Sequence, residues 1–216
     1  VGSEMCIRDR DKAINGVLAH FKEFKSYCFL SATPIPNNLK PAIFNDIPEY
    51  IADWNTTDEI TVYPYHTNKP YMVAVKFIKT YQAKGCLNVN GIESKEAYFF
   101  INSVTEIKAI LKQTQLTEDD YRIICADNPK NRRTLEGYTI SSSADAPKKF
   151  NFITSKSFEG VDFHSETGLC FVVSNVQNRH TLVSIDMDIP QIVGRIRTKS
   201  NPFRNKVVHI LSLIHI

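Results

Sequence analysis

Two arginines and a glutamine near the end of the chain are the side chains best suited to chemistry. They lie in residues 191–197, which read QIVGRIR and follow Pro190. Guanidinium groups bind phosphoryl oxygens and stabilise the charge that develops when a phosphoryl group is transferred. Gln191 and Arg195 would share one face of a helix, which we expect over residues 189–197. The segment predicts a phosphate-directed site; its alternative is a basic helix exposed to solvent.

A second polar segment, TSKSFEGVD, begins where the apolar run FNFI ends. Thr154 and Ser155 close the predicted strand, where their hydroxyls could donate to a backbone phosphate of a nucleic acid. Gly160 permits a close approach of the main chain to a ligand, and Asp162 offers a carboxylate to a ribose hydroxyl or a water molecule. The alternative is a polar loop that binds nothing.

Small hydroxyl residues end two further apolar runs. Ser31 and Thr33 belong to the sequence SAT that closes the run YCFL, and Ser103 follows the run AYFFIN. Ser103 with Glu106 three residues later is a capping-box pattern, so the helix that starts there would offer free N–H groups to a phosphate. Taken singly, each of these segments fits an ordinary strand end equally well.

Strands and helices that alternate along the chain must position these segments. Apolar runs predict strands at residues 27–30, 97–102, 122–126, 150–154, 169–174 and 206–210. Helical spacing predicts helices at 12–25, 70–84 and from 104, with Asn68 as a candidate cap and Gly85 just past the end of the second. Continuous apolar runs indicate strands covered on both faces, so we expect an α/β fold with a parallel, doubly wound sheet flanked by helices.

Residues 35–65 differ from the rest of the chain in composition. Four prolines stand at positions 36, 41, 48 and 64, among Asn and aromatic residues. Such a segment predicts an irregular connection, with one short helix near 49–54, and we place a domain boundary in it. Residues 127–149 are polar and predict a long loop.

The two ends of the chain resemble translated sequencing-adapter sequence. They are residues 1–10 (VGSEMCIRDR) and 211–216 (LSLIHI). We therefore expect the gene product to cover residues 11–210 and to be a fragment. The alternative for the tail is a buried last strand over residues 207–214.

The composition is that of an ordinary globular protein. The 216 residues are 43% hydrophobic and 23% charged, and the formal net charge of +3 permits a nucleic-acid partner without arguing for one. No apolar run approaches the length of a membrane span. The cysteines at 28, 86, 125 and 170 form no CxxC pair, which argues against zinc. Those at 28, 125 and 170 lie in apolar runs, so we expect buried thiols.

The order of the four segments is more specific than any one of them. SAT, FFINS, TSKSFEGVD and QIVGRIR follow one another as the later motifs of superfamily 2 helicases do, and most of residues 25–210 resembles that family. The ending GRIRT is similar to DEAD/DEAH-type helicases of phage and viral replication, including the herpesvirus origin-binding protein group. The resemblance implies that residues 11–40 end a first RecA-like domain, 41–65 connect the domains, and 66–210 form a second RecA-like domain.

The resemblance also implies roles for individual residues. Ser31 and Thr33 match a motif that couples nucleotide hydrolysis to strand movement. Thr154 matches a threonine that contacts the nucleic-acid backbone. Gly160 and Asp162 match residues near the nucleotide and the domain interface.

Gln191, Gly194 and Arg195 match the motif QxxGRxxR, in which an arginine reaches the γ-phosphate of ATP held by the other domain. The second arginine of that motif would fall at position 198, where this chain has Thr198, and an arginine stands one position earlier, at Arg197. Whether Arg195 or Arg197 is the arginine finger stays open on this ground.

The implied activity is ATP-dependent movement along a nucleic acid, with DNA favoured over RNA, in the cytoplasm of a bacterial or phage-infected cell. The cofactors would be ATP and Mg²⁺, bound mainly by an upstream domain, because no GxxxxGK(S/T) loop and no acidic box precede SAT here. This chain alone would then be no complete ATPase. The alternative is a helicase-like nucleic-acid-binding or scaffold module that has lost catalysis. An unrelated doubly wound nucleotide enzyme is disfavoured, because no Gly-rich turn follows an early strand.

Overall fold

The computed structural model describes residues 15–30, 40–52, 59–155 and 161–212. The chain divides into two compact units, residues 1–57 and 58–216. In the smaller unit, residues 15–20 are helical, and 3-10 helices follow at Phe21–Glu23 and Ala42–Phe44. The boundary between the units falls inside the proline-rich residues 35–65.

The segment 27–30 is not the buried strand that its apolar residues predict. It has no strand conformation and all of its residues are exposed, Leu30 to 92%. Phe21 packs edge-on against Tyr27 and Phe29, with ring centroids 4.7 and 5.2 Å away. A strand needs neighbours for its backbone hydrogen bonds, and the described part of this unit contains no second strand. Cys28, expected to be buried, is accordingly exposed.

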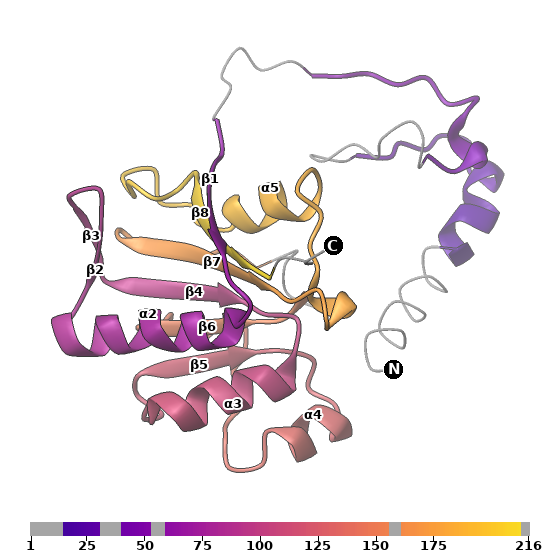
Figure 1. Ribbon diagram of the computed structural model, residues 1–216. Coiled ribbons are helices and arrows are strands. Elements are labelled where there is room, and N and C mark those ends of the chain that lie inside the picture. Colours follow the sequence, from indigo (N-terminus) through magenta and orange to yellow (C-terminus); the bar gives the residue numbers. More distant parts are fainter. Residues whose placement is uncertain (1–14, 31–39, 53–58, 156–160, 213–216) are drawn as a thin grey trace. The chain divides into compact units, whose positions relative to one another are not determined.

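The larger unit is built on a six-stranded sheet in which neighbouring strands are parallel (Figure 1). In spatial order the strands are β1 (Thr61–His66), β8 (Lys206–Leu211), β7 (Gly168–Ser174), β4 (Glu96–Phe100), β6 (Phe150–Ile153) and β5 (Tyr121–Ile124). The helices are α2 (Pro70–Lys84), α3 (Val104–Thr114), α4 (Pro129–Thr134) and α5 (Asp188–Val193). The fold is α/β, as predicted, and is consistent with a Rossmann-like or RecA-like domain.

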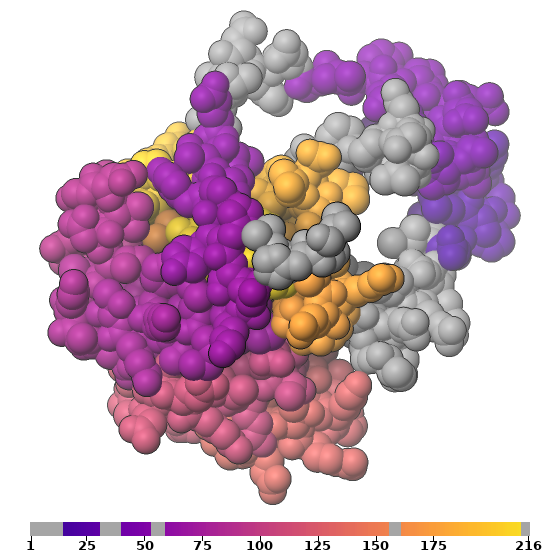
Figure 2. Space-filling view, in the orientation of Figure 1, coloured from indigo at the N-terminus to yellow at the C-terminus, as the bar shows by residue number. Residues whose placement is uncertain are grey.

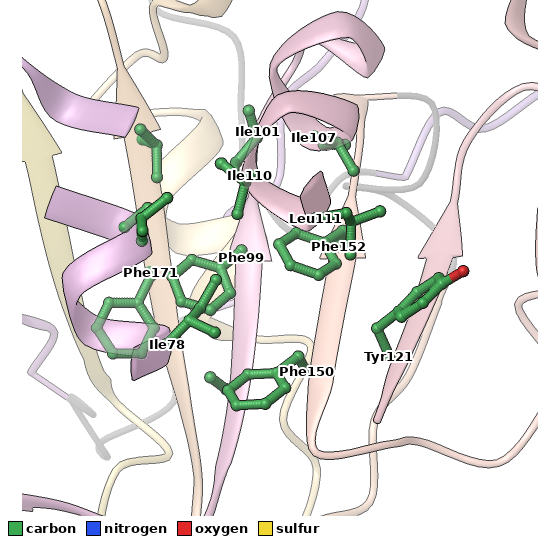
Figure 3. Packing of buried hydrophobic residues seen from close by; sticks show 14 of the residues in the cluster. Ile78, Phe99, Ile101, Ile107, Ile110, Leu111, Tyr121, Phe150, Phe152 and Phe171 are labelled. Carbon is green, nitrogen blue, oxygen red and sulfur yellow. The ribbon is translucent and has the colours of Figure 1, made fainter. Parts of the chain in front are cut away.

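One face of the sheet is buried under α2 and α3. Phe99 of β4 stacks between Phe171 of β7 and Phe152 of β6, with ring centroids 4.8 and 5.6 Å apart (Figure 3). Ile78 of α2 and Ile110 of α3 are fully buried in the same cluster. In the space-filling view these two helices cover much of the sheet from this side (Figure 2). Burying each such side chain stabilises the fold by about 1.5–3 kcal/mol.

The opposite face is buried under α5 and the segment around Phe163. The Phe163 ring lies 4.7 Å from that of Tyr98, and Ile189 and Ile192 of α5 complete the cluster. Because apolar layers cover both faces, β4, β6 and β7 read as continuous apolar runs in the sequence. None of the helices described for this chain has the length and apolar character of a membrane span.

The strand β1 lies where we expected an irregular connection, so that prediction is wrong for its last residues. Pro64 stands in the middle of β1, opposite His209 of β8. β1 is the outermost strand of the sheet. A proline is compatible with that place, since its missing N–H removes no bond on the side away from β8. The proline that argued against a strand therefore marks an edge strand.

Two small elements escaped the sequence. A hairpin joins β2 (Leu87–Val89) to β3 (Ile92–Ser94) through Asn90 and Gly91, whose φ angles are 53° and 86°. Asn-Gly is the preferred pair for such a two-residue turn. The helix α4 interrupts the predicted loop 127–149, and the Asn128 side chain caps it by accepting the N–H of Asn131 at 2.8 Å. Asn before Pro is the local signal that could have located it.

The ends of the longer elements agree with the sequence in part. Gly85 ends α2 at a φ of 77°, as predicted, but the N-cap is Lys69 rather than Asn68. Leu211, which opens the predicted adapter tail, is the last residue of β8, and the hydroxyl of Ser212 accepts the N–H of Val176 at 2.8 Å. Cys125 and Cys170 are buried, as expected.

Candidate functional site

Arg195 and Arg197 lie in an extended segment beyond α5, not on a helix. The helix ends at Val193, and Ile196 forms a parallel bridge with Phe163. The N–H of Phe163 donates to the carbonyl of Arg195 at 2.7 Å, and the N–H of Arg197 donates to the carbonyl of Phe163 at 2.9 Å. The predicted helix over residues 189–197 is therefore too long. Glycine at 194 disfavours its continuation, and the bridge buries Ile196.

The extended conformation places both guanidinium groups beside one carboxylate. Successive side chains of an extended segment point to opposite sides, and Ile196 is buried while both arginines contact Asp162. Arg197 Nε donates to Asp162 Oδ1 at 2.8 Å, and Arg195 Nη1 lies 3.8 Å from the same oxygen. A spacing of two residues thus brings the arginines together here, where a helix would need three or four.

The two arginines differ in their exposure to water. The Arg195 side chain is 15% exposed, and its Nε donates to the main-chain carbonyl of Gln191 at 2.9 Å. The Arg197 side chain is 51% exposed and that of Asp162 is 49% exposed. The predicted proximity of Gln191 and Arg195 is therefore confirmed, through a backbone contact. Arg195 is held in place, whereas Arg197 remains accessible.

Gly194 is required by packing rather than by its backbone angles. Its φ of −63° suits any residue, but an added Cβ would lie 3.2 Å from the carbonyl oxygen of Pro190. A side chain there would press on the last turn of α5. This tight turn sets where the arginine-bearing segment leaves the helix.

A second polar cluster joins the carboxyl ends of β4 and β6. The Ser155 hydroxyl donates to Asn102 Oδ1 at 2.7 Å, and Asn102 Nδ2 donates to the carbonyl of His180 at 2.6 Å. Thr154 is buried next to Ser155, and its N–H donates to the carbonyl of Ile124 at 3.0 Å. Asn102 therefore ties two strand ends to the loop after β7. Sequence reasoning assigned it no role; an Asn ending a buried parallel strand was the available signal.

Ser103 is occupied by its own helix. Its hydroxyl accepts the N–H of Glu106 at 3.4 Å as the N-cap of α3, which confirms the predicted cap. The reciprocal half of a capping box is replaced, because the N–H of Ser103 donates to the carbonyl of Ile101 at 2.8 Å. Burial raises the pKa of the Glu106 carboxyl. The Ser103 hydroxyl positions α3, and any phosphate contact would come from α3 main-chain N–H groups.

The predicted site residues thus fall into two described clusters and one undescribed set. Asp162, Arg195 and Arg197 form the first cluster; Asn102 and Ser155 form the second. In the first, one carboxylate faces two guanidinium groups, so the cluster keeps a positive charge. Ser31, Thr33 and Gly160 lie outside the described residues.

Metal binding has no candidate ligands in the described ranges, which contain no group of three or more His, Cys, Asp or Glu side chains placed to hold an ion. Comparison with protein-family models and with curated protein sequences finds no match to this chain. The α/β fold is therefore shown by the structure, and the function must be argued from the two clusters.

Proposed function

We propose that this chain is part of an ATP-dependent nucleic-acid helicase or translocase of superfamily 2, and that it supplies most of the second RecA-like motor domain. The observation that carries the proposal is the pairing of Arg195 and Arg197 on Asp162, next to the segment that follows β6. The four motif-like segments are the second support, since they follow the order of the later helicase motifs.

The arginine cluster has the donor set that a triphosphate requires on one side. Arg195 is oriented by Asp162 and by the Gln191 carbonyl before any ligand arrives. Donors that are already oriented stabilise a developing charge without reorganisation at the moment of reaction. ATP would supply the phosphoryl group that is transferred to water, with Mg²⁺ held by groups outside this cluster. Within this chain, Arg195 binds the γ-phosphate and Arg197, the more exposed guanidinium, binds an outer phosphate oxygen.

The second cluster fits contact with a nucleic-acid backbone. Thr154 and Ser155 end β6 beside Asn102, and α3 begins directly after Ser103. Hydroxyl and main-chain N–H donors of this kind bind phosphate without reading base sequence. Asn102 also holds the carbonyl of His180, so a load on the strand ends would reach the loop that leads into α5. The proposal links nucleic-acid binding to the arginine cluster along this route.

The test uses the full-length protein of the source reading frame, with single-stranded DNA as cofactor. Arg195→Ala should lower the DNA-stimulated ATPase kcat by roughly 10³-fold, because an arginine finger contributes on that order, while ATP affinity stays nearly unchanged. Lys112→Ala, at an exposed position in the last turn of α3, is the matched control. Unchanged turnover in Arg195→Ala would remove that residue from the role. DNA binding without any ATPase in the wild type would favour the inactive scaffold module instead.

A further inference from the structure

Arg122 carries a buried charge that neither cluster uses. It lies in β5 and is 2% exposed, with its Cζ 5.3 Å from the centroid of the Phe163 ring. Its Nε donates to Asn151 Oδ1 at 2.7 Å, and its Nη1 donates to the carbonyl of Asp145. Both acceptors are neutral, and no carboxylate of the described residues forms an ion pair with Arg122. Burial accordingly lowers the pKa of the Arg122 guanidinium.

A cleft of about 330 Å³ opens beside this guanidinium, at the amino ends of β5 and β6. Its charged floor consists of Arg122 and Lys148, and its walls include Ser141, Ile140 and Ala146. The Lys148 ammonium donates to the main-chain carbonyl of Glu118. Both cations of the cleft are thus held by neutral oxygens, which leaves their charge without a balancing anion. We call this feature the Arg122 cleft.

Two acids at the rim restrict the ligand that the Arg122 cleft accepts. Glu118 is exposed and accepts the hydroxyl of Thr139 at 3.1 Å, and Asp145 is exposed and accepts the N–H of Ser142 at 2.8 Å. These carboxylates would repel a doubly charged phosphate more strongly than a singly charged anion. The apolar side chains of Ile140 and Ala146 suit a ligand with a hydrocarbon part.

We propose that the Arg122 cleft binds a small organic monocarboxylate, whose carboxylate pairs with Arg122 and Lys148 and whose apolar part lies against Ile140 and Ala146. A planar carboxylate matches the fork of a guanidinium, and the volume lies at the lower end of the range for small-molecule sites. The Arg122 cleft is separate from the residues proposed to bind nucleotide and nucleic acid, so this site stands or falls independently of the proposed function.

Benzoate is the probe, and the measurement is a titration of the ¹⁵N-labelled full chain followed by NMR. We expect saturable shifts of the Ser141 and Ala146 amides. Arg122→Gln should weaken benzoate binding by about tenfold or more, because it removes a charge-assisted hydrogen bond. Lys112→Gln, the removal of an exposed cation outside the cleft, should leave binding unchanged.

Ala146→Trp fills the cleft without removing a charge and decides the outcome if Arg122→Gln fails to fold. Loss of benzoate binding in Ala146→Trp supports the site. Shifts that do not saturate in the wild type, or that persist in Ala146→Trp, overturn it. Inorganic phosphate is titrated in parallel, and binding as tight as that of benzoate would overturn the carboxylate class.

Discussion

Arg122 and the pair Arg195 and Arg197 contact the same residue, Phe163, in different surroundings. Arg122 lies over the Phe163 ring, is almost fully buried and is bound by neutral oxygens. The pair flanks the Phe163 main chain, shares a carboxylate, and the Arg197 side chain is half exposed. A buried guanidinium depends on each partner, because water cannot replace a lost one. An exposed pair keeps water as a substitute, so its partner orients it more than it stabilises the fold.

Phe163→Ala should have the largest effect, because it removes the residue on which the comparison depends. The side chain is 1% exposed, and truncating a buried phenylalanine costs about 3–5 kcal/mol. Urea unfolding of the full chain, followed by circular dichroism, measures the loss. Ile185→Ala, at a site 66% exposed, is the control and should change stability by no more than about 0.5 kcal/mol. A loss near that of the control would mean that Phe163 does not anchor this face.

Asn151→Ala tests the buried side of the comparison. It leaves the Nε of Arg122 and the N–H of Lys148 without their shared acceptor, which should cost about 1–3 kcal/mol. A double-mutant cycle with Arg122→Met isolates the bond from the packing of the amide, again by urea unfolding. The double mutant should lose less than the sum of the two single losses. Simple additivity would show that the Arg122–Asn151 bond contributes nothing.

Asp162→Asn tests the exposed side and should have the smallest effect on stability. The carboxylate and Arg197 are each about half exposed, and exposed ion pairs contribute at most about 1 kcal/mol. Asp127→Asn, which weakens the similarly exposed pair of Asp127 with Arg132, is the matched control and should give a comparable loss. The two free energies of unfolding are measured at low and high salt. A salt-independent loss above ~2 kcal/mol for Asp162→Asn alone would show that this cluster is structurally buried.

Residues that pack on both sides could be located from sequence, whereas residues that depend on a neighbour could not. The runs that became β4, β6 and β7 are buried on both faces, and the apolar face of α2 packs on the sheet as its spacing predicts. The run 27–30 has the same composition but is exposed. The strand β1 was hidden by Pro64, which is compatible with a strand because of its edge position. Local pattern reports what a segment could bury, not whether a partner is present.

The candidate site divides in the same way. Residue types and their order along the chain sufficed to single out Asp162, Arg195 and Arg197, since guanidinium and carboxylate chemistry is a property of the side chains themselves. That Arg195 and Arg197 meet on one carboxylate was decided by the bridge between Phe163 and Ile196, which makes residues 195–197 extended instead of helical. Asn102 gained its contacts in the same manner, because two strands far apart in sequence end side by side. Chemistry was written in the sequence, but which groups share an atom was settled by long-range backbone pairing, which no local pattern encodes.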